Sequence, residues 1–587
     1  MYLFAAIFLL MATGAGAIAQ DADAALVRFF QEYLDGESRM RPLSASSLGD
    51  HRFDHLLDDL SAAARGRHVI FLRSTLEDLP RRVDADRLSR SGRVDYEILR
   101  HELGKELWQV ENNDRFERDP RVYNDYINGS VYQLLTQSTL GKETNIANGI
   151  SRMLLIPDVI AAALENLKAP ARVVTETAIR QNRGAISFYQ NELFELAGPT
   201  PQRERLEATA ASVVESLTSY QRFLEQDLLP RAQGEWRIGR AKFERKLELE
   251  LDAGLTADQV LDDAIREFER VVGEMYVFAR QLWSAYFPNS PVPPDDAEGR
   301  RTLIRKVLAR IGTEHGTPEN LVRDARATVD RIKEFIRSRD VLALPEPDRC
   351  NLIEMPEFQR GNSIAFLNSA PPLDPRAISI YAISPPPRDW SAARVESFLQ
   401  EYNRHMLQIL TIHEAYPGHY VQLEYANRNP SLIRRILGSG VYIEGWAVYT
   451  EQTLLDQGYG DRDLALRLSQ LKFYLRAVGN AILDHRMHCT EMTDEEALRF
   501  LVDEVFQSEG EARLKVIRAK QSSVQLSTYF VGRMAHYRLR QQIQREMGEA
   551  FNLGRYHEAV LKQGSVPVKF LPELVRSALG LPVRSEN

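Results

Sequence analysis

The sequence predicts a mainly α-helical protein with a small β insertion, and three observations lead to this prediction. Over most of the 587 residues, apolar side chains recur at steps of three and four, as on one face of a helix. Between about residues 341 and 390, this pattern gives way to short β-prone runs bounded by prolines. From residue 394 onward the helical periodicity returns. Because one simple core cannot fill a chain of this length, we expect two domains or one large lobed fold.

Residues 1–19 have the pattern of an export signal. Residues 3–12 are apolar, and residues 17–19 (A-I-A) form a cleavage site of the A-x-A type ahead of Gln20. The apolar run is shorter than the roughly 20 residues of a membrane span, and no cysteine follows it as a lipid attachment point. We therefore expect a signal peptide and an exported mature protein, periplasmic or secreted, with no stable membrane anchor after signal cleavage.

Residues 20–340 form the predicted N-terminal helical region. Its clearest helix follows Thr256, a residue type that caps helix N-termini, and its apolar stripe consists of Leu261, Ile265, Phe268, Val272, Met275 and Ala279. Similar stripes, which we interpret as core packing, occupy residues 20–36, 61–80, 86–112, 147–168, 170–197, 201–230 and 317–338. The proline-rich stretch 287–297 is expected to be a surface connection.

Residues 341–587 form the second predicted region, which carries the candidate catalytic residues. It begins with a short β segment over 341–390, expected to be a small sheet or a set of hairpins, whose runs are 342–345, 363–366 and 378–383. Helices are then expected from residue 394 through residue 419 and at 441–456, 462–484, 494–506, 522–547 and 555–563.

The net charge argues against nucleic acid as a partner, and the chain has few cysteines. The net charge is -8 and the pI is near 6.0, so no basic field favours nucleic acid as a partner. Only two cysteines are present, Cys350 and Cys489. In an oxidising compartment they could form a bridge, but two thiols in a chain of this size are more often small buried apolar residues, and the sequence leaves their pairing open.

The most informative stretch is H-E-A-Y-P-G-H at residues 413–419, followed 25 residues later by E-G-W-A at 444–447. Two histidines and a carboxylate from a later helix are the ligands of a catalytic zinc with one open position. In the usual H-E-x-x-H motif the two histidines lie one helical turn apart. Here they are six residues apart, which is about 240° around a regular helix.

Pro417 and Gly418 explain how the two imidazoles can still meet. Pro417 has no N–H for the helical bond to residue 413, and its ring clashes with that carbonyl group. Gly418 adopts conformations that other residues resist. The Pro-Gly pair therefore predicts an interrupted helix in which His419 returns to the side of His413.

These residues predict one Zn²⁺ per chain, because histidine and carboxylate ligands in this arrangement suit zinc best. His413, His419 and Glu444 are the expected ligands, and Glu414 is the expected general base and acid. Glu451 lies seven residues after Glu444 and hence on the same helical face. Glu451 is expected to accept a hydrogen bond from a ligand histidine without touching the metal. Alternatively, Glu451 is the third ligand itself and Glu444 is the residue that does not touch the metal.

The two motifs H-E-A-Y-P-G-H and E-G-W-A-V-Y-T-E together resemble a large bacterial family defined only as a domain of unknown function, whose members look like zinc peptidases. The interval from His419 to Glu444 is also similar to that of the all-α metallopeptidases of the thimet oligopeptidase, angiotensin-converting enzyme and carboxypeptidase Taq types. The resemblance is loose over most of the mature chain and close over residues 405–570. It implies a large multi-helix fold with a substrate channel, a peptide substrate and zinc metallopeptidase activity.

Further matches to that family lie downstream of the motifs. They are Asp484 and His488 of a D-x-x-x-H element, Gln525, Tyr529 and Gly532 of a Q-x-x-x-Y-x-x-G element, and residues 556–561 with Gly564 and Pro567 of the closing segment. Asp484 is carried over from this match as an outer partner of the site. The chain departs from the family at Tyr420, Ser523, Val524 and Phe530, which puts its substrate preference in doubt.

A zinc peptidase also needs a donor aimed at the developing oxyanion. Tyr529, His488 and His557 are the candidates, in that order, and each could equally be a structural residue. If the enzyme trims from the carboxyl end, an arginine should bind the terminal carboxylate as a fork. Arg518, Arg533 and Arg538 could do so, and the sequence does not select among them.

The sequence therefore predicts an exported zinc metallopeptidase that cleaves short peptides by metal-activated water. Two alternatives remain. The chain could be a non-catalytic relative that binds peptides or other ligands, as the changes at Tyr420, Ser523 and Phe530 would allow. It could also be a zinc hydrolase of non-peptide amides or esters, because activated water attacks each of these bonds similarly.

Overall fold

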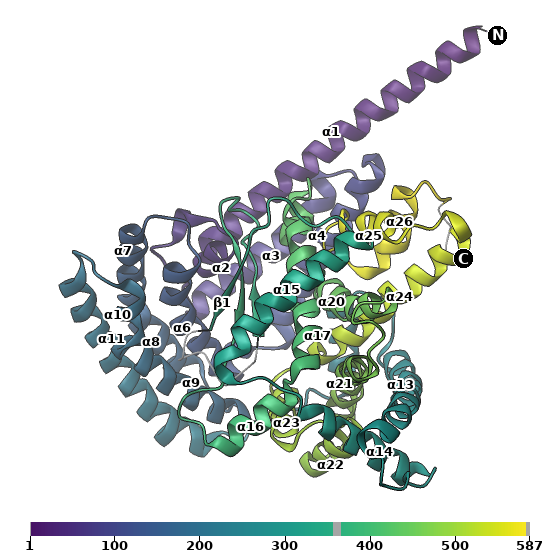
Figure 1. Ribbon diagram of the computed structural model, residues 1–587. Coiled ribbons are helices and arrows are strands. Elements are labelled where there is room, and N and C mark those ends of the chain that lie inside the picture. Colours follow the sequence, from purple (N-terminus) through teal and green to yellow (C-terminus); the bar gives the residue numbers. More distant parts are fainter. Residues whose placement is uncertain (1, 356–364, 583–587) are drawn as a thin grey trace. The chain divides into compact units, whose positions relative to one another are not determined.

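The computed structural model describes residues 2–355 and 365–582 and confirms a mainly α-helical fold with a small sheet (Figure 1). The chain divides into two compact units. Unit 1 comprises Met1–Trp236, Pro371–Ala377 and Pro430–Leu437. Unit 2 comprises Arg237–Ala370, Ile378–Asn429 and Gly438–Asn587. The helices between residues 240 and 338, which the sequence analysis grouped with the N-terminal region, therefore belong to the same unit as the zinc motif.

Unit 1 is helical throughout its described part. Its helices are α1 (Tyr2–Met40), α2 (Pro42–Ser47), α3 (Ala62–Arg82), α4 (Arg90–Asn112), α5 (Arg115–Arg118), α6 (Arg121–Thr136), α7 (Lys142–Met153), α8 (Ile156–Asn166), α9 (Arg172–Gln190), α10 (Glu192–Ala197), α11 (Arg203–Phe223) and α19 (Leu432–Ile436). In the described part of the chain, one stretch, Lys142–Asn166, is apolar enough to cross a membrane by length and composition, but 56% of its apolar 18-residue window is buried inside the protein. Its side chains belong to the apolar core that α6 to α11 share.

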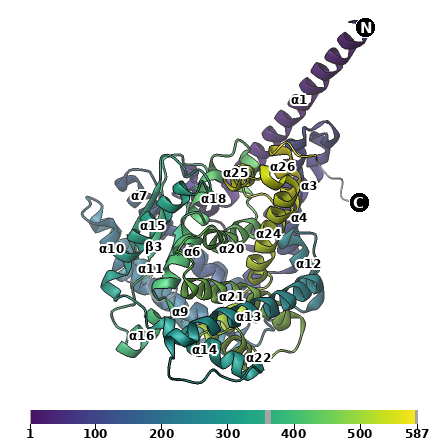
Figure 2. The ribbon, with the colours of Figure 1, turned by 45° about the vertical axis from the view of Figure 1, so that its right-hand side comes forward.

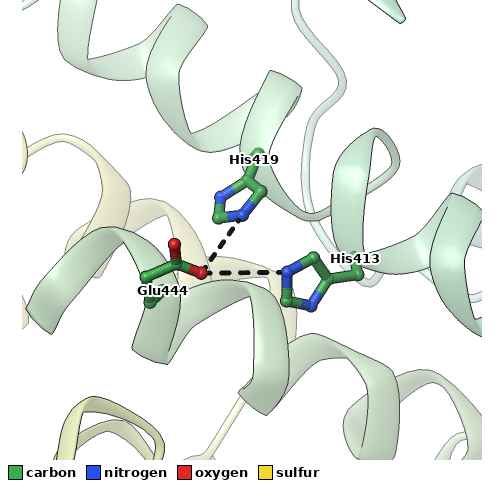
Figure 3. Close-up of side chains that lie close together, drawn as sticks. All are labelled: His413, His419 and Glu444. Atoms are coloured by element: carbon green, nitrogen blue, oxygen red, sulfur yellow. Dashed lines mark ion pairs between the residues drawn. The ribbon is translucent and has the colours of Figure 1, made fainter. Parts of the chain in front are cut away.

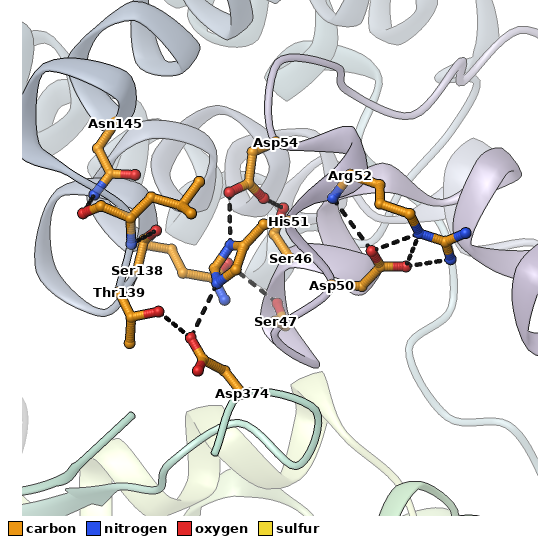
Figure 4. Close-up of polar contacts among 12 residues, drawn as sticks. Ser46, Ser47, Asp50, His51, Arg52, Asp54, Ser138, Thr139, Asn145 and Asp374 are labelled. Atoms are coloured by element: carbon orange, nitrogen blue, oxygen red, sulfur yellow. Dashed lines mark hydrogen bonds and ion pairs between the residues drawn. The ribbon is translucent and has the colours of Figure 1, made fainter. Parts of the chain in front are cut away.

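Polar contacts attach the segment Pro371–Ala377 to the rest of unit 1 (Figure 4). His51 lies between two carboxylates, with its Nδ1 2.8 Å from Asp54 Oδ2 and its Nε2 3.2 Å from Asp374 Oδ2. Asp374 also accepts a hydrogen bond from the Thr139 hydroxyl. The segment Pro430–Leu437 is attached in the same way, because Arg434 pairs with Asp95 at 2.6 Å.

Unit 2 contains the sheet and the remaining helices. The helices are α12 (Arg240–Leu251), α13 (Ala257–Tyr286), α14 (Ala297–Gly312), α15 (Leu321–Ser338), α16 (Ala392–Glu401), α17 (Arg404–Glu414), α18 (His419–Asn427), α20 (Gly440–Asp456), α21 (Leu464–Cys489), α22 (Asp494–Arg499), α23 (Glu509–Gln521), α24 (Thr528–Met547), α25 (Leu553–Leu561) and α26 (Leu571–Ala578). Helix α13 lies along α21 (Figure 2). It begins with a capping box in which Thr256 and Gln259 bond each other's backbone N–H groups, which confirms Thr256 as an N-cap.

Within the described residues, the sheet of unit 2 has three strands, β1 (Cys350–Glu354), β2 (Ala365–Asn368) and β3 (Ser379–Ile383), in the order β1-β3-β2. β1 is parallel to β3 and β2 is antiparallel to it. The runs at 378–383 and 363–366 correspond to β3 and β2, although residues 363 and 364 lie outside the described residues. The run 342–345 is not a strand. Helix α15 packs on this sheet, and β2 is an edge strand next to α17, which carries the first residues of the motif.

Candidate metal centre

The H-E-A-Y-P-G-H stretch is split between two helices, which confirms the predicted interruption. Helix α17 ends at Glu414 and α18 begins at His419. Gly418 lies so close to the end of α17 that a Cβ atom there would be 1.8 Å from the carbonyl oxygen of His413. Pro417 contributes a carbonyl oxygen that accepts a hydrogen bond of 2.8 Å from the Trp446 indole. The break between the two helices therefore requires a glycine at position 418, and the hydrogen bond from Trp446 of the second motif holds the preceding residue, Pro417, in place.

The structure brings His413, His419 and Glu444 together (Figure 3). Glu444 Oε2 lies 3.8 Å from His413 Nε2 and 3.5 Å from His419 Nε2. The two imidazole rings are 4.7 Å apart and nearly perpendicular, at 87°. In a tetrahedral zinc site with bonds of about 2.0–2.2 Å, neighbouring donor atoms are about 3.3–3.6 Å apart. One of the two distances to Glu444 Oε2 falls in this range and the other is slightly longer, so these three side chains could hold a metal ion such as zinc.

Glu451 orients the first of these histidines. Its Oε1 atom lies 2.7 Å from His413 Nδ1, on the side of the ring opposite Glu444. A carboxylate at Nδ1 places the ring proton there and leaves Nε2 free to bind a cation. Burial, reinforced by His419, lowers the pKa of His413 to about 3, so the ring stays neutral. Glu451 therefore lies where a partner of a ligand histidine is needed, while Glu444 faces both rings.

Glu414 is directly beside the three-residue cluster but bonds elsewhere. Its Oε2 atom accepts a hydrogen bond of 3.1 Å from the backbone N–H of Leu367 in strand β2. Burial raises the pKa of Glu414 to about 7, with His419 opposing the shift and Glu444 adding to it. A carboxylate with a pKa in this range can both take up and release a proton near neutral pH, as a general base and acid must.

A close crossing of α20 and α24 brings Tyr529 towards Glu444. Gly445, next to Glu444, contacts Gly532, and a Cβ atom on Gly445 would be 2.3 Å from the Gly532 carbonyl carbon. Tyr529 precedes Gly532 by three residues and so lies on the same face of α24. Burial raises the pKa of Tyr529, and the charge of Glu444 raises it further, which keeps the phenol protonated as a donor. Its hydroxyl accepts a hydrogen bond of 3.2 Å from Arg518.

Asp484 and His488 hold the turn before α24. Asp484 accepts hydrogen bonds from the backbone N–H of Val524 at 3.1 Å and from the Ser527 hydroxyl at 3.0 Å. His488 Nε2 lies 2.8 Å from the Ser522 carbonyl oxygen. Val524 has a φ of 70°, a strained conformation for a β-branched residue. Both side chains therefore position the start of the helix that carries Tyr529.

His557 is bonded on both ring nitrogens. Its Nδ1 donates to the Val341 carbonyl oxygen at 2.8 Å, and its Nε2 accepts from the Tyr449 hydroxyl at 2.8 Å. Burial lowers its pKa to about 3. The structure thus places His557 in a satisfied buried network with Tyr449 and Trp446, whose ring centroid lies 5.3 Å away.

Replacing Asp484 with Asn is expected to change the pH dependence of stability. Burial raises the pKa of Asp484 to about 7, from an ordinary value of 3.8. The unfolded chain therefore releases this proton as pH rises past about 4, and the folded protein does so only near 7. Stability that is present at pH 4 is lost between these values. Asp484→Asn removes the loss, so its free energy of unfolding at pH 8 should exceed that of the wild type by up to about 3–4 kcal/mol.

Urea unfolding at pH 4.5 and pH 8 tests this expectation. The variant and the wild type should be similar at the lower pH and differ at the higher one. The exposed Asp158→Asn change is the control and should show no such divergence. An Asp484→Asn protein that is destabilised equally at both pH values would show that the buried carboxyl group is ionised throughout.

Three features of the site were not identified from the sequence. They are the bond from the backbone N–H of Leu367 to Glu414, the bond from the Trp446 indole to the Pro417 carbonyl oxygen, and the bond from Arg518 to the Tyr529 hydroxyl. The tryptophan is part of the E-G-W-A motif, so its presence was visible but not its bond. The two cysteines, Cys350 and Cys489, are free thiols.

Comparison with known proteins identifies two similar solved structures and a family. A protein of Shewanella oneidensis, described as "a putative lipoprotein of unknown function", is 30% identical, with a TM-score of 0.79 over 94% of this chain and 99% of that chain. A "putative lipoprotein" of Colwellia psychrerythraea is 18% identical and shares the fold, with a TM-score of 0.77 over 96% of this chain and 99% of that chain. No curated protein matches the chain. The family described as "bacterial protein of unknown function (DUF885)" matches residues 42–575, and the chain therefore belongs to this family.

Proposed function

We propose that this protein is an exported zinc-dependent hydrolase that cleaves short peptides. The observation that carries the proposal is the convergence of His413, His419 and Glu444, with Glu414 directly beside them. This is the set of residues that a hydrolytic site requires: three ligands, an open position and a general base. A bound zinc ion would supply Lewis acidity, acidifying a water molecule and polarising the carbonyl group of the substrate.

The chain's own residues divide the remaining chemistry. Glu414 takes the proton from the attacking water and passes it to the leaving amine. The bond from Leu367 N–H holds this carboxylate in place. Tyr529, whose phenol is near enough to Glu444 for that charge to raise its pKa, is our candidate donor to the oxygen on which negative charge develops. Glu451 keeps His413 in the tautomer that a ligand needs.

Strand β2 supports a peptide as the substrate. β2 is an edge strand of the described sheet, and its Leu367 directs its N–H to the general base rather than to β3. An extended peptide that adds to such an edge is held by backbone hydrogen bonds and needs no particular side chain. A peptide on β2 would therefore have its backbone next to Glu414. Esters and compact amides lack the repeating backbone that this edge would bind.

The proposal is tested by metal analysis of the purified mature protein together with digestion of a peptide library, read by mass spectrometry. One zinc per chain and cleaved peptides are the expected results. One zinc per chain with intact peptides, but with hydrolysed ester or non-peptide amide substrates, would show that the protein is a zinc hydrolase of another class and not a peptidase. A protein that holds no zinc after reconstitution would contradict the proposed function.

Replacing Glu451 with Ala is expected to weaken zinc binding by about 10- to 100-fold, because outer partners of ligand histidines typically contribute this much. Without Glu451, the Nδ1 proton of His413 loses its acceptor and the ring loses its orientation. Competition with a chromophoric chelator measures the affinity. Glu495→Gln, an exposed change on α22, is the control. An unchanged zinc affinity in Glu451→Ala would show that Glu451 does not contribute to metal binding.

We also propose that the protein works in the cell envelope. The apolar residues 3–12 and the A-I-A sequence at 17–19 support export. The two similar solved proteins are each described as a "putative lipoprotein", a class of protein that is attached to the cell envelope.

A further inference from the structure

Helix α23 presents a row of charged side chains on one face. Glu511, Lys515 and Arg518 follow one another at intervals of four and three residues, so they project from the same side of the helix. Arg476 of α21 faces this row, with its Nη2 atom 3.6 Å from Glu511 Oε1. The four side chains form the group that we call the α23 cluster.

The α23 cluster has more positive charge than its carboxylates balance. Glu511 accepts the Tyr402 hydroxyl at 2.8 Å and pairs with Arg476. Glu401, the other nearby acid, pairs with Lys472 at 2.7 Å and lies 4.0 Å from Arg476. Among the described residues, no carboxylate lies within ion-pair distance of Lys515 or Arg518. Two cations thus remain without an anionic partner.

The state of Lys515 supports this imbalance. Its pKa is lowered to about 7, first by burial and then by the charges of Arg476 and Arg518. A lysine with a bound carboxylate would instead keep its proton firmly, because an opposite charge favours the charged form. The lowered pKa agrees with the absence of a carboxylate at ion-pair distance from Lys515 among the described residues.

Arg518 connects the α23 cluster to the metal centre. Its Nη2 atom donates to Gln525 Oε1 at 2.8 Å and to the Tyr529 hydroxyl at 3.2 Å. Its charge is close enough to Glu444 to contribute to lowering the pKa of that ligand. The side chain is exposed, so a ligand can reach it. Arg518 is thus held in place by neutral partners, with donors left for a further acceptor.

The other two arginines that the sequence offered are already paired. Arg533 is buried and lies 3.3 Å from Glu267, and Arg538 lies 2.9 Å from Asp263. At either residue, a substrate carboxylate would have to displace the carboxylate that is already paired with the arginine. At Arg518, a substrate carboxylate would form a new ion pair without displacing another acid.

We propose that Arg518, assisted by Lys515 one turn away, binds the free carboxylate at the C-terminus of the peptide substrate, so that the enzyme removes short fragments from that end. This inference rests on the proposed function. In the reaction, water adds its oxygen to the carbonyl carbon, the C–N bond breaks, and Glu414 transfers the proton to the leaving nitrogen. The released fragment then carries the new amino group and the carboxylate that Arg518 holds.

The test uses pairs of peptides that differ only in a C-terminal carboxylate or carboxamide. Calorimetry with metal-free wild-type protein measures binding without turnover, and we expect the carboxylate form to bind at least tenfold more tightly because charge-assisted, bidentate bonds are lost in the amide. In Arg518→Gln the two forms should bind equally. Arg518→Lys, which keeps the charge but not the fork, should recover part of the preference.

Arg513→Gln is the matched control, because Arg513 lies on the same helix and pairs with Glu509 at the surface. It should keep the full preference of the wild type. With zinc-loaded enzyme, mass spectrometry should show product fragments from the C-terminal end only. Equal binding of the two peptide forms by the wild type would overturn the inference, whether or not Arg518→Gln folds. Preference for the carboxylate without any cleavage would leave the carboxylate site intact and contradict the proposed function instead.

Discussion

Replacing Glu414 with Gln is expected to lower kcat by about 10³-fold or more while the protein keeps its zinc. General acid–base groups contribute about 10²–10⁴-fold to enzymatic rates, and Glu414 would serve in both the uptake and the release of the proton. Glutamine has nearly the same shape, and its amide oxygen can still accept the bond from Leu367 N–H. The ligands His413, His419 and Glu444 are untouched, so metal content should not change.

The measurement combines single-turnover peptide cleavage with zinc analysis of the same preparation. Glu495→Gln makes the same chemical change at an exposed position and should have wild-type activity. A Glu414→Gln enzyme that cleaves within tenfold of the wild type would show that another group handles the proton. Loss of zinc together with activity would show that Glu414 belongs among the ligands.

Replacing Gly445 with Ala is expected to destabilise the protein by about 3 kcal/mol or more, at the upper end of the cost of overpacking. The added methyl group would lie 2.3 Å from the Gly532 carbonyl carbon and 2.4 Å from its Cα. These are backbone atoms of α24, which cannot move aside as a flexible side chain can. Separation of α20 from α24 would also move Glu444, so zinc affinity should fall with stability.

Gly440→Ala is a matched control on the same helix, since nothing lies within 4 Å of a Cβ atom there. It should be neutral or stabilise the protein by up to about 1 kcal/mol, the difference in helix propensity between the two residues. Urea unfolding of both variants, with and without zinc, gives the comparison. A Gly445→Ala protein as stable as Gly440→Ala would mean that the two helices do not cross as closely as described.

The local parts of the site could be predicted from the sequence because their causes are local. A proline and a glycine between two histidines interrupt a helix wherever they occur, and α17 does end at Glu414. The seven-residue step from Glu444 to Glu451 likewise fixes both on one face of α20. The fold class followed from periodicity in the same way, since most helices carry their own apolar stripe.

Contacts between distant segments could not be predicted. Strand β1 has a mixed composition and becomes a strand only because β3, 29 residues later in register, pairs with it. The bond from Leu367 to Glu414 depends on where the sheet packs against α17. The turn at Val524 is held by Asp484, 40 residues earlier. Residues 237–340 pack with the metal-site helices because α13 lies on α21, a match of two apolar faces that no local pattern contains.

The order of synthesis has a consequence for the first of the two units. A nascent chain that has emerged only to Trp236 contains most of unit 1 but lacks Asp374 for His51 and Arg434 for Asp95. Asp374 and Arg434 lie in later segments of unit 1, which are translated only after part of unit 2. Until then, His51 and Asp95 lack these ion-pair partners. Truncation at residue 236 should therefore yield an incomplete, aggregation-prone fragment, because unit 1 is complete only once the ribosome has passed residue 437.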